Sequence, residues 1–483
     1  MFKRTLWVLV SVLLVASMLL SACNGEEPTE QMTEEPTEEM TEEPTEEMTE
    51  EPTPTEEMAE ETEEAMPTEE MEEEMAFSCE EDISGETVNV LAVWGGDELE
   101  SFEAMVAPWE EATGAMMDYE GTRDLNAVLT TRVEGGNPPD IAGLPGPGQL
   151  RQYADEGYLV DLSTFMDMEM LQEDYADTWI DLATFDGGLY GIFTKAAIKS
   201  LVWYSPPNFE EAGYEIPEES WDEMMELSQT IIDDGNAPWC LGLESGAASG
   251  WPGTDWIEDI MLRTAGPEVY DQWWQHEIPW TDEAVRNAWE IFGQVATDGD
   301  MVQGGTTAVL ATGFGESVYP MLQEPPGCYM HRQAIFIQSF IQDQFPDAQP
   351  IEDFDYFAFP PIDEQYGTPA LVAGDLFGLF NDEPAARCLM RWLATDDAQS
   401  IWAERGGFIA TNRNVAPEIY PDQLTQQAAE VLVEADVVRF DASDLMPSAV
   451  NDAFWSGILE YVENPDQLDS ILQNIESVAE ENY

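Results

Sequence analysis

Two short stretches combine aromatic rings with carboxylates in a way that suits carbohydrate binding. Trp251-Pro252-Gly253-Thr254-Asp255-Trp256 holds two indoles and a carboxylate, and Trp94-Gly95-Gly96-Asp97-Glu98 holds an indole and two carboxylates. An indole packs on the apolar face of a pyranose, while a carboxylate accepts hydrogen bonds from neighbouring hydroxyls. Both stretches therefore indicate a sugar site. The alternatives are core packing for each tryptophan and a solvated face or helix cap for each acid.

Three further places combine polar and apolar residues. His331 and Arg332 follow Cys328 in an apolar neighbourhood, where a hydrogen-bond cluster beside a disulfide is the alternative to ligand contact. Asp375 comes just after a predicted strand, and a buried aspartate there needs a partner or a ligand to offset its desolvation. The segment from Arg439 to Pro447 can cap the next helix, a role that is compatible with binding.

The sequence contains no catalytic motif. GxSxG, HExxH, P-loop and GxGxxG patterns are all absent, and His276 and His331 are the two histidines of the chain. The cysteines do not have the spacing of a zinc site. We therefore expect no enzymatic activity, no cofactor and no metal. A glycoside hydrolase with paired carboxylates is the alternative that motifs leave open.

The first part of the body must position these groups, and it alternates strands with helices. Strands are predicted at 87–94, 116–119 and 140–144, and helices at 98–113 and 125–134. The first helix should place Phe102, Met105, Val106 and Trp109 on one face and end at Gly114. This alternation indicates a parallel sheet whose ligand-facing edge lies beyond the carboxyl ends of its strands. Trp94, Arg123 and the turn Pro145–Gly148 fall at that edge.

The rest of the body is richer in helices. We expect helices at 221–233, 256–263, 281–297, 383–395 and 397–405, two more at the C-terminus, and short strands at 356–359 and 371–373. The most apolar late run, Ala370–Phe380, is short and contains Asp375, so the body should lack a membrane-spanning helix.

The N-terminus predicts export. Lys3 and Arg4 precede an apolar run from Leu6 to Leu20, which is a secretory signal, and Leu20-Ser21-Ala22-Cys23 has the pattern of a lipobox. Cys23 would then become an acylated, membrane-anchored N-terminus on the outer face of the bacterial cell membrane. The alternative is an ordinary signal peptide in which Cys23 has no special role.

An acidic spacer follows the leader. From Glu26 to about Met75 the chain repeats TEEPTEEM, as in Thr33–Met40 and Thr41–Met48, with almost nothing to bury. We expect a disordered, extended segment that holds the body away from the membrane.

The formal net charge is −86, and the acidity continues into the body, which has Lys195 and Lys199 as its lysines. Such a surface repels nucleic acid and anionic lipid, which excludes both as partners of the body. The composition also suggests adaptation to salt or acid. The salt version of this hypothesis predicts that the melting temperature rises from low to molar salt.

Cys79, Cys240, Cys328 and Cys388 are left once Cys23 is assigned to lipid. An even number in an exported chain favours disulfides, and the residues alone leave three pairings open.

Several motifs together resemble the substrate-binding lipoproteins of alpha-glucoside ABC transporters, within the extracellular sugar-binding proteins of maltose-binding type. The motifs are Leu201–Tyr204, Cys240–Pro252, Cys328–Gln333 and Arg439–Pro447, and the resemblance covers Thr87 to the C-terminus. One departure is Tyr204-Ser205-Pro206-Pro207, which lacks the basic residue expected after the first proline.

The resemblance implies a two-lobed α/β fold of periplasmic-binding-protein type, with several crossovers between the lobes. Residues 1–22 would be the signal peptide, 23–82 the lipidated cysteine and spacer, 83–200 with 372–420 lobe one, and 201–371 with 421–483 lobe two. It also implies that Cys240 pairs with Cys328, and Cys79 with Cys388.

The resemblance further implies a monomeric receptor that captures an alpha-glucoside or short gluco-oligosaccharide between its lobes and delivers it to permease subunits. The expected ligand contacts are Trp94, Glu98, Arg123, Asp124 and Asp375 from lobe one, and Trp251, Asp255, His331, Arg332, Arg439, Asp441 and Asp444 from lobe two. A surface adhesin for polysaccharide is a further alternative, in which an open groove binds long chains.

Overall fold

The computed structural model describes residues 77–217, 220–434 and 437–483. The signal peptide, Cys23 and nearly all of the acidic spacer lie outside the described residues. Within the described ranges, no helix has both the length and the apolar character that a membrane crossing needs.

A seven-stranded mixed sheet is built around the predicted strand–helix alternation. β1 (Thr87–Ala92) pairs in parallel with β2 (Met116–Gly121) and β3 (Ile141–Leu144). The main strand order is β11-β6-β10-β3-β1-β2, and β12 adds to β10. The other strands are β6 (Gly191–Ile198), β10 (Ala370–Leu379), β11 (Ile409–Ala410) and β12 (Val438–Phe440).

The parallel pairing predicted for the first three strands is confirmed, but the complete sheet is mixed. β10 runs antiparallel to both β3 and β6, because the chain re-enters the sheet here after its long excursion through residues 199–369. The strand predicted at 371–373 is therefore the start of a longer one, and Asp375 lies inside β10 rather than after a strand.

Helices cover this larger sheet. α2 (Asp97–Thr113) buries Phe102, Met105, Val106 and Trp109, the face that its periodicity predicted, and ends at Gly114, whose φ of 73° is left-handed. The other helices of this part and its small hairpin are α3 (Leu125–Glu134), α4 (Pro147–Asp155), α5 (Met168–Asp174), α6 (Asp177–Leu182), β4 (Thr184–Phe185), β5 (Gly188–Leu189), α14 (Pro384–Leu393), α15 (Asp396–Ala403) and α16 (Gln423–Glu434).

A three-stranded antiparallel sheet anchors the second lobe. β7 (Leu201–Tyr204) lies between β8 (Met330–Arg332) and β9 (Asp355–Ala358). Its helices are α7 (Pro206–Ala212), α8 (Trp221–Asp233), α9 (Trp251–Thr264), α10 (Pro267–Trp274), α11 (Glu283–Ala296), α12 (Thr306–Ala311), α13 (Ile337–Gln344), α17 (Ala442–Leu445), α18 (Ser448–Glu463) and α19 (Leu468–Asn482). α9 is buried along nearly its whole length, so the lobe packs around it.

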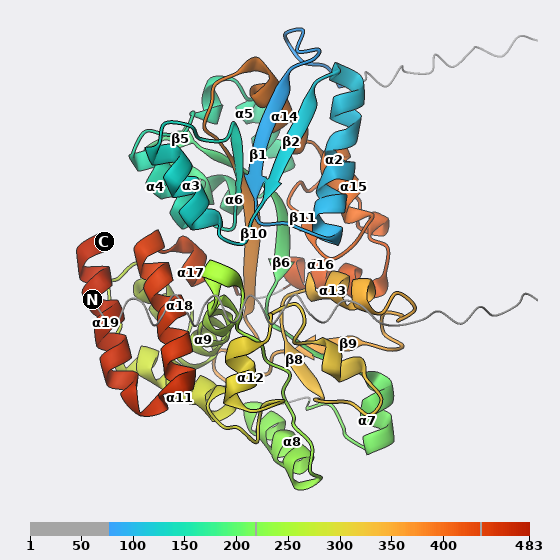
Figure 1. The fold of residues 1–483 in the computed structure, drawn as a ribbon, viewed down its shortest axis with the longest axis vertical. Coiled ribbons are helices and arrows are strands. Elements are labelled where there is room, and N and C mark those ends of the chain that lie inside the picture. Colours follow the sequence, from blue (N-terminus) through green and yellow to red (C-terminus); the bar gives the residue numbers. More distant parts are fainter. Residues whose placement is uncertain (1–76, 218–219, 435–436) are drawn as a thin grey trace, which may run out of the picture. The chain divides into compact units, whose positions relative to one another are not determined.

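The fold is a two-lobed α/β fold of periplasmic-binding-protein type, and the chain crosses between the lobes more than once. Figure 1 shows β6 and β10 running side by side from the larger sheet towards α9 and β8. The lobe boundaries stay a prediction. α16, which follows residue 420, contacts β6 and β11 of the larger sheet.

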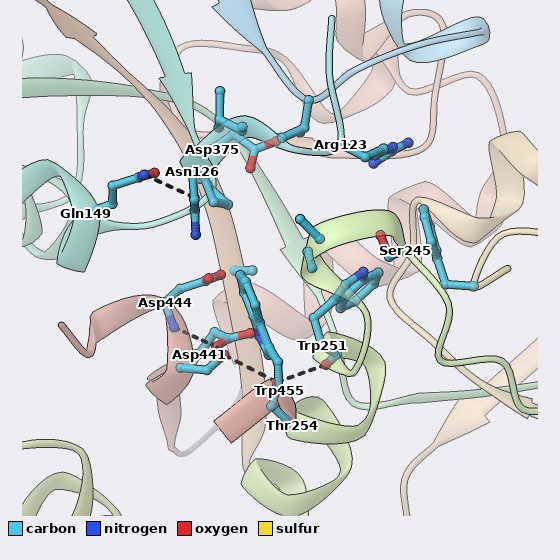
Figure 2. Close-up of a pocket in the computed structure, with 18 of the residues that line it drawn as sticks. Arg123, Asn126, Gln149, Ser245, Trp251, Thr254, Asp375, Asp441, Asp444 and Trp455 are labelled. Atoms are coloured by element: carbon cyan, nitrogen blue, oxygen red, sulfur yellow. Dashed lines mark hydrogen bonds between the residues drawn. The ribbon is translucent and has the colours of Figure 1, made fainter. Parts of the chain in front are cut away.

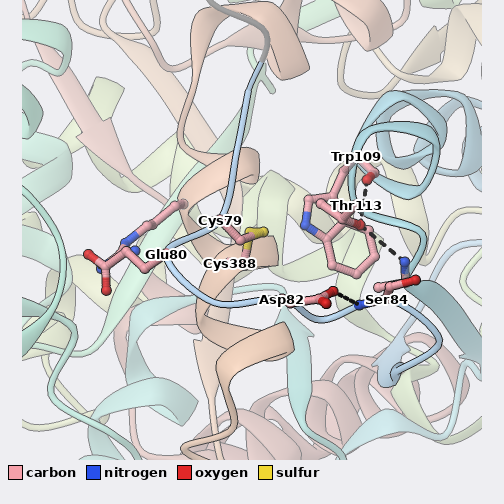
Figure 3. The surroundings of a disulfide bond; sticks show 9 residues. Cys79, Glu80, Asp82, Ser84, Trp109, Thr113 and Cys388 are labelled. Carbon is pink, nitrogen blue, oxygen red and sulfur yellow. Dashed lines mark hydrogen bonds and ion pairs between the residues drawn. A yellow bond between two sulfur atoms is a disulfide. The ribbon is translucent and has the colours of Figure 1, made fainter.

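The structure joins Cys79 to Cys388 and Cys240 to Cys328, the two pairings that the resemblance implies. The first bond ties the start of the described chain to α14 (Figure 3). Around it, Glu80 forms an ion pair with Arg391 at 3.0 Å, and Phe77 packs on Trp392. These contacts fix the point at which the spacer reaches the body.

Candidate functional site

A cavity of about 810 Å³ lies beyond the carboxyl ends of β1, β2 and β3, where Trp94, Arg123 and Pro145 follow those strands. Figure 2 shows its two walls: Gln149, Asn126, Asp375 and Arg123 lie along the upper one, and Asp444, Asp441, Trp455, Trp251 and Ser245 along the lower one. Among the expected ligand contacts, the cavity lining includes Trp94, Glu98, Arg123, Trp251, Asp255, Asp375, Asp441 and Asp444.

One end of the cavity is organised by Lys195 on β6. Its Nζ lies 2.9 Å from Glu98 Oε1 and 3.0 Å from Asp375 Oδ2, and the same Asp375 oxygen accepts a 3.1 Å hydrogen bond from Trp94 Nε1. Burial alone would lower the pKa of Lys195, but the charges of Asp375 and Glu98 outweigh it and raise that pKa. The ammonium therefore stays charged and presents a fixed donor beside two fixed acceptors.

Local structure explains how these groups meet. Glu98 lies in the first turn of α2, directly after the Gly95-Gly96 turn that follows β1. Asp375 lies at a bulge in β10, where the register with β6 shifts between Asp375 and Leu376. A bulge redirects a side chain within an otherwise regular strand. It brings Asp375 to Lys195 on the neighbouring strand.

A second part of the cavity wall is organised by Lys199, just after β6. Its Nζ lies 2.9 Å from Asp255 Oδ1 and also contacts Asp441. Asp255 belongs to a polar stripe on α9, with Glu258, Asp259 and Arg263 at helical spacing, and all of these residues are fully buried. Arg332 Nη1 reaches Asp255 Oδ2 at 3.2 Å and also binds Asp259. Asp255, Asp259 and Arg263 are thus each paired with an opposite charge, whereas Glu258 accepts the backbone amides of Ala442 and Ser443 instead.

Carboxyl groups outnumber cations in this cluster, and their pKa values reflect it. Burial raises the pKa of Asp255 to about 6, despite the opposing charges of Lys199 and Arg332. Burial and the charge of Asp441 raise the pKa values of Glu258 and Asp444 well above the usual range. Asp441 itself has a lowered pKa, because Lys199 and its hydrogen bonds outweigh its burial. The cluster therefore retains protons at a pH where exposed carboxyls have lost theirs.

Asp255, Glu258 and Asp441 lie close enough together to hold a metal ion. Lys199 already binds Asp255 and Asp441, so its ammonium supplies the positive charge that a cation would bring. We assign no metal to this cluster.

Trp251 begins α9 and lines the cavity. Its ring packs on Phe314 at 5.1 Å between centroids and on Phe336, and Lys199 Nζ lies 5.4 Å from it. Trp256, five residues on, instead packs among Trp239, Phe292 and Phe359 in the core. The stretch Trp251–Trp256 is the start of a helix, so its two tryptophans point to different environments.

Four expected contacts do not line the cavity. His331 is buried and its Nδ1 pairs with the Cys240 carbonyl at 2.9 Å; burial lowers its pKa to about 4, so the ring is neutral. Arg332 forms ion pairs with Asp255 and Asp259 within the buried cluster. Arg439 forms a bidentate ion pair with Asp271, and Asp124 accepts a hydrogen bond from the Ala247 amide.

Sequence reasoning missed several residues that do line the cavity: Lys195, Lys199, Asn126, Gln149, Ser245, Asp452 and Trp455. For the two lysines a signal existed, because they are the lysines of an otherwise strongly acidic body. Asn126 and Gln149, which share a 3.0 Å hydrogen bond, belong to no motif.

Residues 95–400 match the model of the family described as bacterial extracellular solute-binding protein. The osmoprotective compounds-binding protein GgtB of Synechocystis sp. is 46% identical over 386 residues, which cover 80% of this chain and 90% of that protein. The alpha-glucosides-binding periplasmic protein AglE of Rhizobium meliloti is 38% identical over 404 residues, covering 81% and 87%.

Solved structures show the same fold at low identity. The solute receptor AcbH matches with a TM-score of 0.72 at 18% identity, covering 82% of this chain and 99% of that one. Maltose-bound MalE3 of T. maritima matches at 0.63 and 16%, covering 82% and 99%. The relatives are named as binding proteins and not as enzymes. The family model matches residues 95–400, most of the body, and the fold has two lobes with a cavity lined by charged and aromatic side chains. The chain therefore belongs to the bacterial extracellular solute-binding proteins.

Proposed function

We propose that the protein is the receptor of an ABC importer and captures an alpha-glucoside or short gluco-oligosaccharide between its lobes for delivery to the permease. The observation that carries the proposal is the pair of buried lysines at the crossing between lobes. Each ammonium lies among two carboxylates at the cavity wall, beside Trp94 or Trp251.

This arrangement suits the chemistry of a sugar. Adjacent hydroxyls on a pyranose each donate and accept, so a fixed ammonium between two carboxylates can satisfy two neighbouring hydroxyls at once. Trp251, whose ring lies at the cavity wall, supplies an apolar face for the ring carbons. The name of AglE, an alpha-glucosides-binding protein, supports an alpha-glucoside as the ligand, and that of GgtB, a binder of osmoprotective compounds, supports a small solute.

The size of the cavity supports more than one sugar unit. Pockets of about 300–1,000 Å³ bury most of a drug-sized ligand, and 810 Å³ lies high in that range. Beyond the lysines, the cavity continues along α3, α4 and α18, where Asn126, Gln149 and Trp455 offer amides and an indole. This end supplies neutral partners for a second unit.

The test is calorimetric titration and thermal shift on residues 78–483 with maltose, trehalose, sucrose, glucose and maltotriose, using galactosides and amino acids as controls. A ligand that binds the native state alone adds about 2.7 kcal/mol of stability at 100 times its Kd. We expect a selective rise with at least one alpha-glucoside. Folded protein that responds to no sugar contradicts the proposal, and preference for long polysaccharide over free disaccharide indicates an adhesin.

We also propose that acylated Cys23 anchors the receptor to the membrane through the acidic spacer. The lipobox pattern Leu20–Cys23 supports it. Expression of the full chain and of Cys23→Ser should place the first in the membrane fraction and the second in the soluble exported fraction. Equal distribution of the two proteins contradicts the anchor.

A further inference from the structure

The turn after β2 touches a loop of the opposite lobe directly. The Ala247 amide donates a 3.1 Å hydrogen bond to Asp124 Oδ1, across 123 positions of sequence. Asp124 precedes α3 on the larger sheet, whereas Ala247 lies in the loop that leads into α9. The bond therefore joins the two lobes beside the cavity.

Asp124 does not face the ligand space. Its neighbours Arg123 and Leu125 line the cavity, and so do Ser245 to Ser249 on the opposite lobe, but Asp124 itself is not among the lining residues. Its carboxylate instead accepts a hydrogen bond from the Ala247 backbone amide of the other lobe. A substitution at Asp124 therefore alters the contact between lobes without removing a ligand contact.

The loop that contains Ala247 is stabilised by hydrogen bonds of its own. The Gly246 amide binds Glu244 Oε1 at 2.9 Å, the Ser245 amide binds Ser249 Oγ at 2.9 Å, and Ser249 Oγ donates to the Gly246 carbonyl at 2.7 Å. Gly246 has a φ of 59°, and a side-chain carbon there would lie 3.2 Å from Asp124 Oδ1. Glycine at 246 thus permits the close approach.

Arg123 adds a second contact between the lobes. Its guanidinium carbon lies 5.1 Å from the centroid of Phe314, a cation–π geometry, while Nη2 lies 3.7 Å from Glu98 Oε2 on its own lobe. Phe314 in turn packs on Trp251. The two contacts, Asp124 with Ala247 and Arg123 with Phe314, form a clasp at the edge of the cavity.

We propose that this clasp stabilises the closed state, so that Asp124 sets the affinity for every ligand as a positioning residue and contacts none of them. The inference rests on the proposed function. A ligand that binds the closed state has an apparent Kd equal to its intrinsic Kd divided by the closed fraction. Weakening the clasp lowers that fraction, and the affinities for all ligands fall by one common factor.

The experiment compares Asp124→Ala and Asp124→Asn with the natural protein. The asparagine oxygen can still accept the Ala247 bond. Asp118→Ala is the matched control, because Asp118 is an exposed acid on β2, the strand that leads into the turn with Asp124. Two readouts are used: calorimetric Kd values for maltose and maltotriose, and hydrogen–deuterium exchange of the 244–250 segment in ligand-free and ligand-saturated protein.

We expect Asp124→Ala to weaken both ligands by the same factor, about fivefold, while Asp124→Asn and Asp118→Ala stay within about twofold of the natural protein. Exchange in 244–250 should be faster in Asp124→Ala than in the natural protein, even at saturation. If Asp124→Ala weakens the affinity for one ligand alone, Asp124 contacts that ligand directly and the clasp is wrong. The clasp is also wrong if Asp124→Asn binds as weakly as Asp124→Ala, or if Asp124→Ala has no effect on affinity.

The experiment distinguishes a wrong clasp from a wrong proposed function. If the natural protein binds none of the sugars in the calorimetric and thermal-shift test, the proposed ligand class is wrong, and the ligand-free exchange data then test the clasp alone. Faster exchange of 244–250 in Asp124→Ala than in Asp118→Ala would then support the contact between lobes, and equal exchange would overturn it.

Discussion

Lys195 and Lys199 are four residues apart on the crossing between the lobes, yet they sit in unlike surroundings. The side chains of Lys195, Glu98 and Asp375 keep 10%, 13% and 18% of their surface exposed, whereas those of Lys199, Asp255 and Asp441 keep 6%, 1% and 1%. The first cluster faces the cavity with accessible oxygens. The second cluster also lines the cavity but is more deeply buried, so we expect the first to contribute more to ligand binding and the second more to stability.

The balance of charge differs too. At Lys195, the ammonium and Arg123 meet Glu98 and Asp375, and the charges match. At Lys199, acids exceed bases, and Glu258 and Asp444 have raised pKa values. A balanced, partly exposed cluster can exchange water for sugar hydroxyls at small cost, whereas in an unbalanced, buried one the loss of a cation leaves carboxylates without a partner.

Removing the Lys199 charge should have the largest effect on stability. Lys199→Met keeps the length of the side chain but leaves Asp255 and Asp441 buried without their cation. Loss of one partner of a buried ion pair costs about 3–5 kcal/mol. We expect a loss of that size in urea unfolding at pH 8. The loss should be smaller at pH 5, because the orphaned carboxyls then take up protons.

Lys195→Met is the matched variant, and we expect it to weaken ligand binding more than it lowers stability. It removes an ammonium that faces the cavity, so we expect the affinity for the glucoside to fall about 10- to 100-fold, as for loss of a charged hydrogen bond. Stability should fall less than in Lys199→Met, because water reaches Glu98 and Asp375. Calorimetric titration and urea unfolding on both variants check this. Equal stability losses would show that the two clusters do not differ in role.

The order of elements was predictable because it depends on local patterns. The apolar spacing of Phe102, Met105, Val106 and Trp109 predicted α2, and the glycine after it predicted its end. Placement of Trp94 and Arg123 at the sheet edge followed from strand order alone. β10 was only partly predicted, because Gly374 interrupts its apolar run and a bulge at Asp375 gives no local signal.

The partners of charged residues were not predictable, because they lie far away in the sequence. Arg439 was expected to bind ligand, but Asp271, 168 positions away, holds it. Lys199 was missed although it is one of two lysines in an acidic body. Its partners could not be predicted, because Asp255 in α9 and Asp441 just before α17 are far from it in the sequence. Sequence patterns report the faces of elements, whereas ion pairs depend on how those faces meet.

The smallest expected effect on stability comes from a substitution of Glu258, which lies in the buried Lys199 cluster. Its carboxylate accepts the backbone amides of Ala442 and Ser443, each at 3.1 Å, and its pKa is raised by burial and by Asp441 and Asp255. A raised folded-state pKa means that the folded protein prefers the protonated form. The resulting stability is complete below the usual glutamate pKa and is lost as pH rises through the folded value.

Glu258→Gln mimics the protonated form and keeps one acceptor oxygen for those amides. We expect it to match the natural protein near pH 5 and to be more stable at pH 8, by about 1 kcal/mol after the loss of one hydrogen bond. Asp441 has a lowered pKa, so its contribution to stability is lost only below the usual aspartate range. Between pH 5 and pH 8 the stability therefore reports the groups whose pKa values are raised. Asp375→Asn, made in the balanced Lys195 cluster, is the control and should show no such gain at pH 8. A gain of equal size there would mean that both clusters carry excess negative charge and that the distinction between them is wrong.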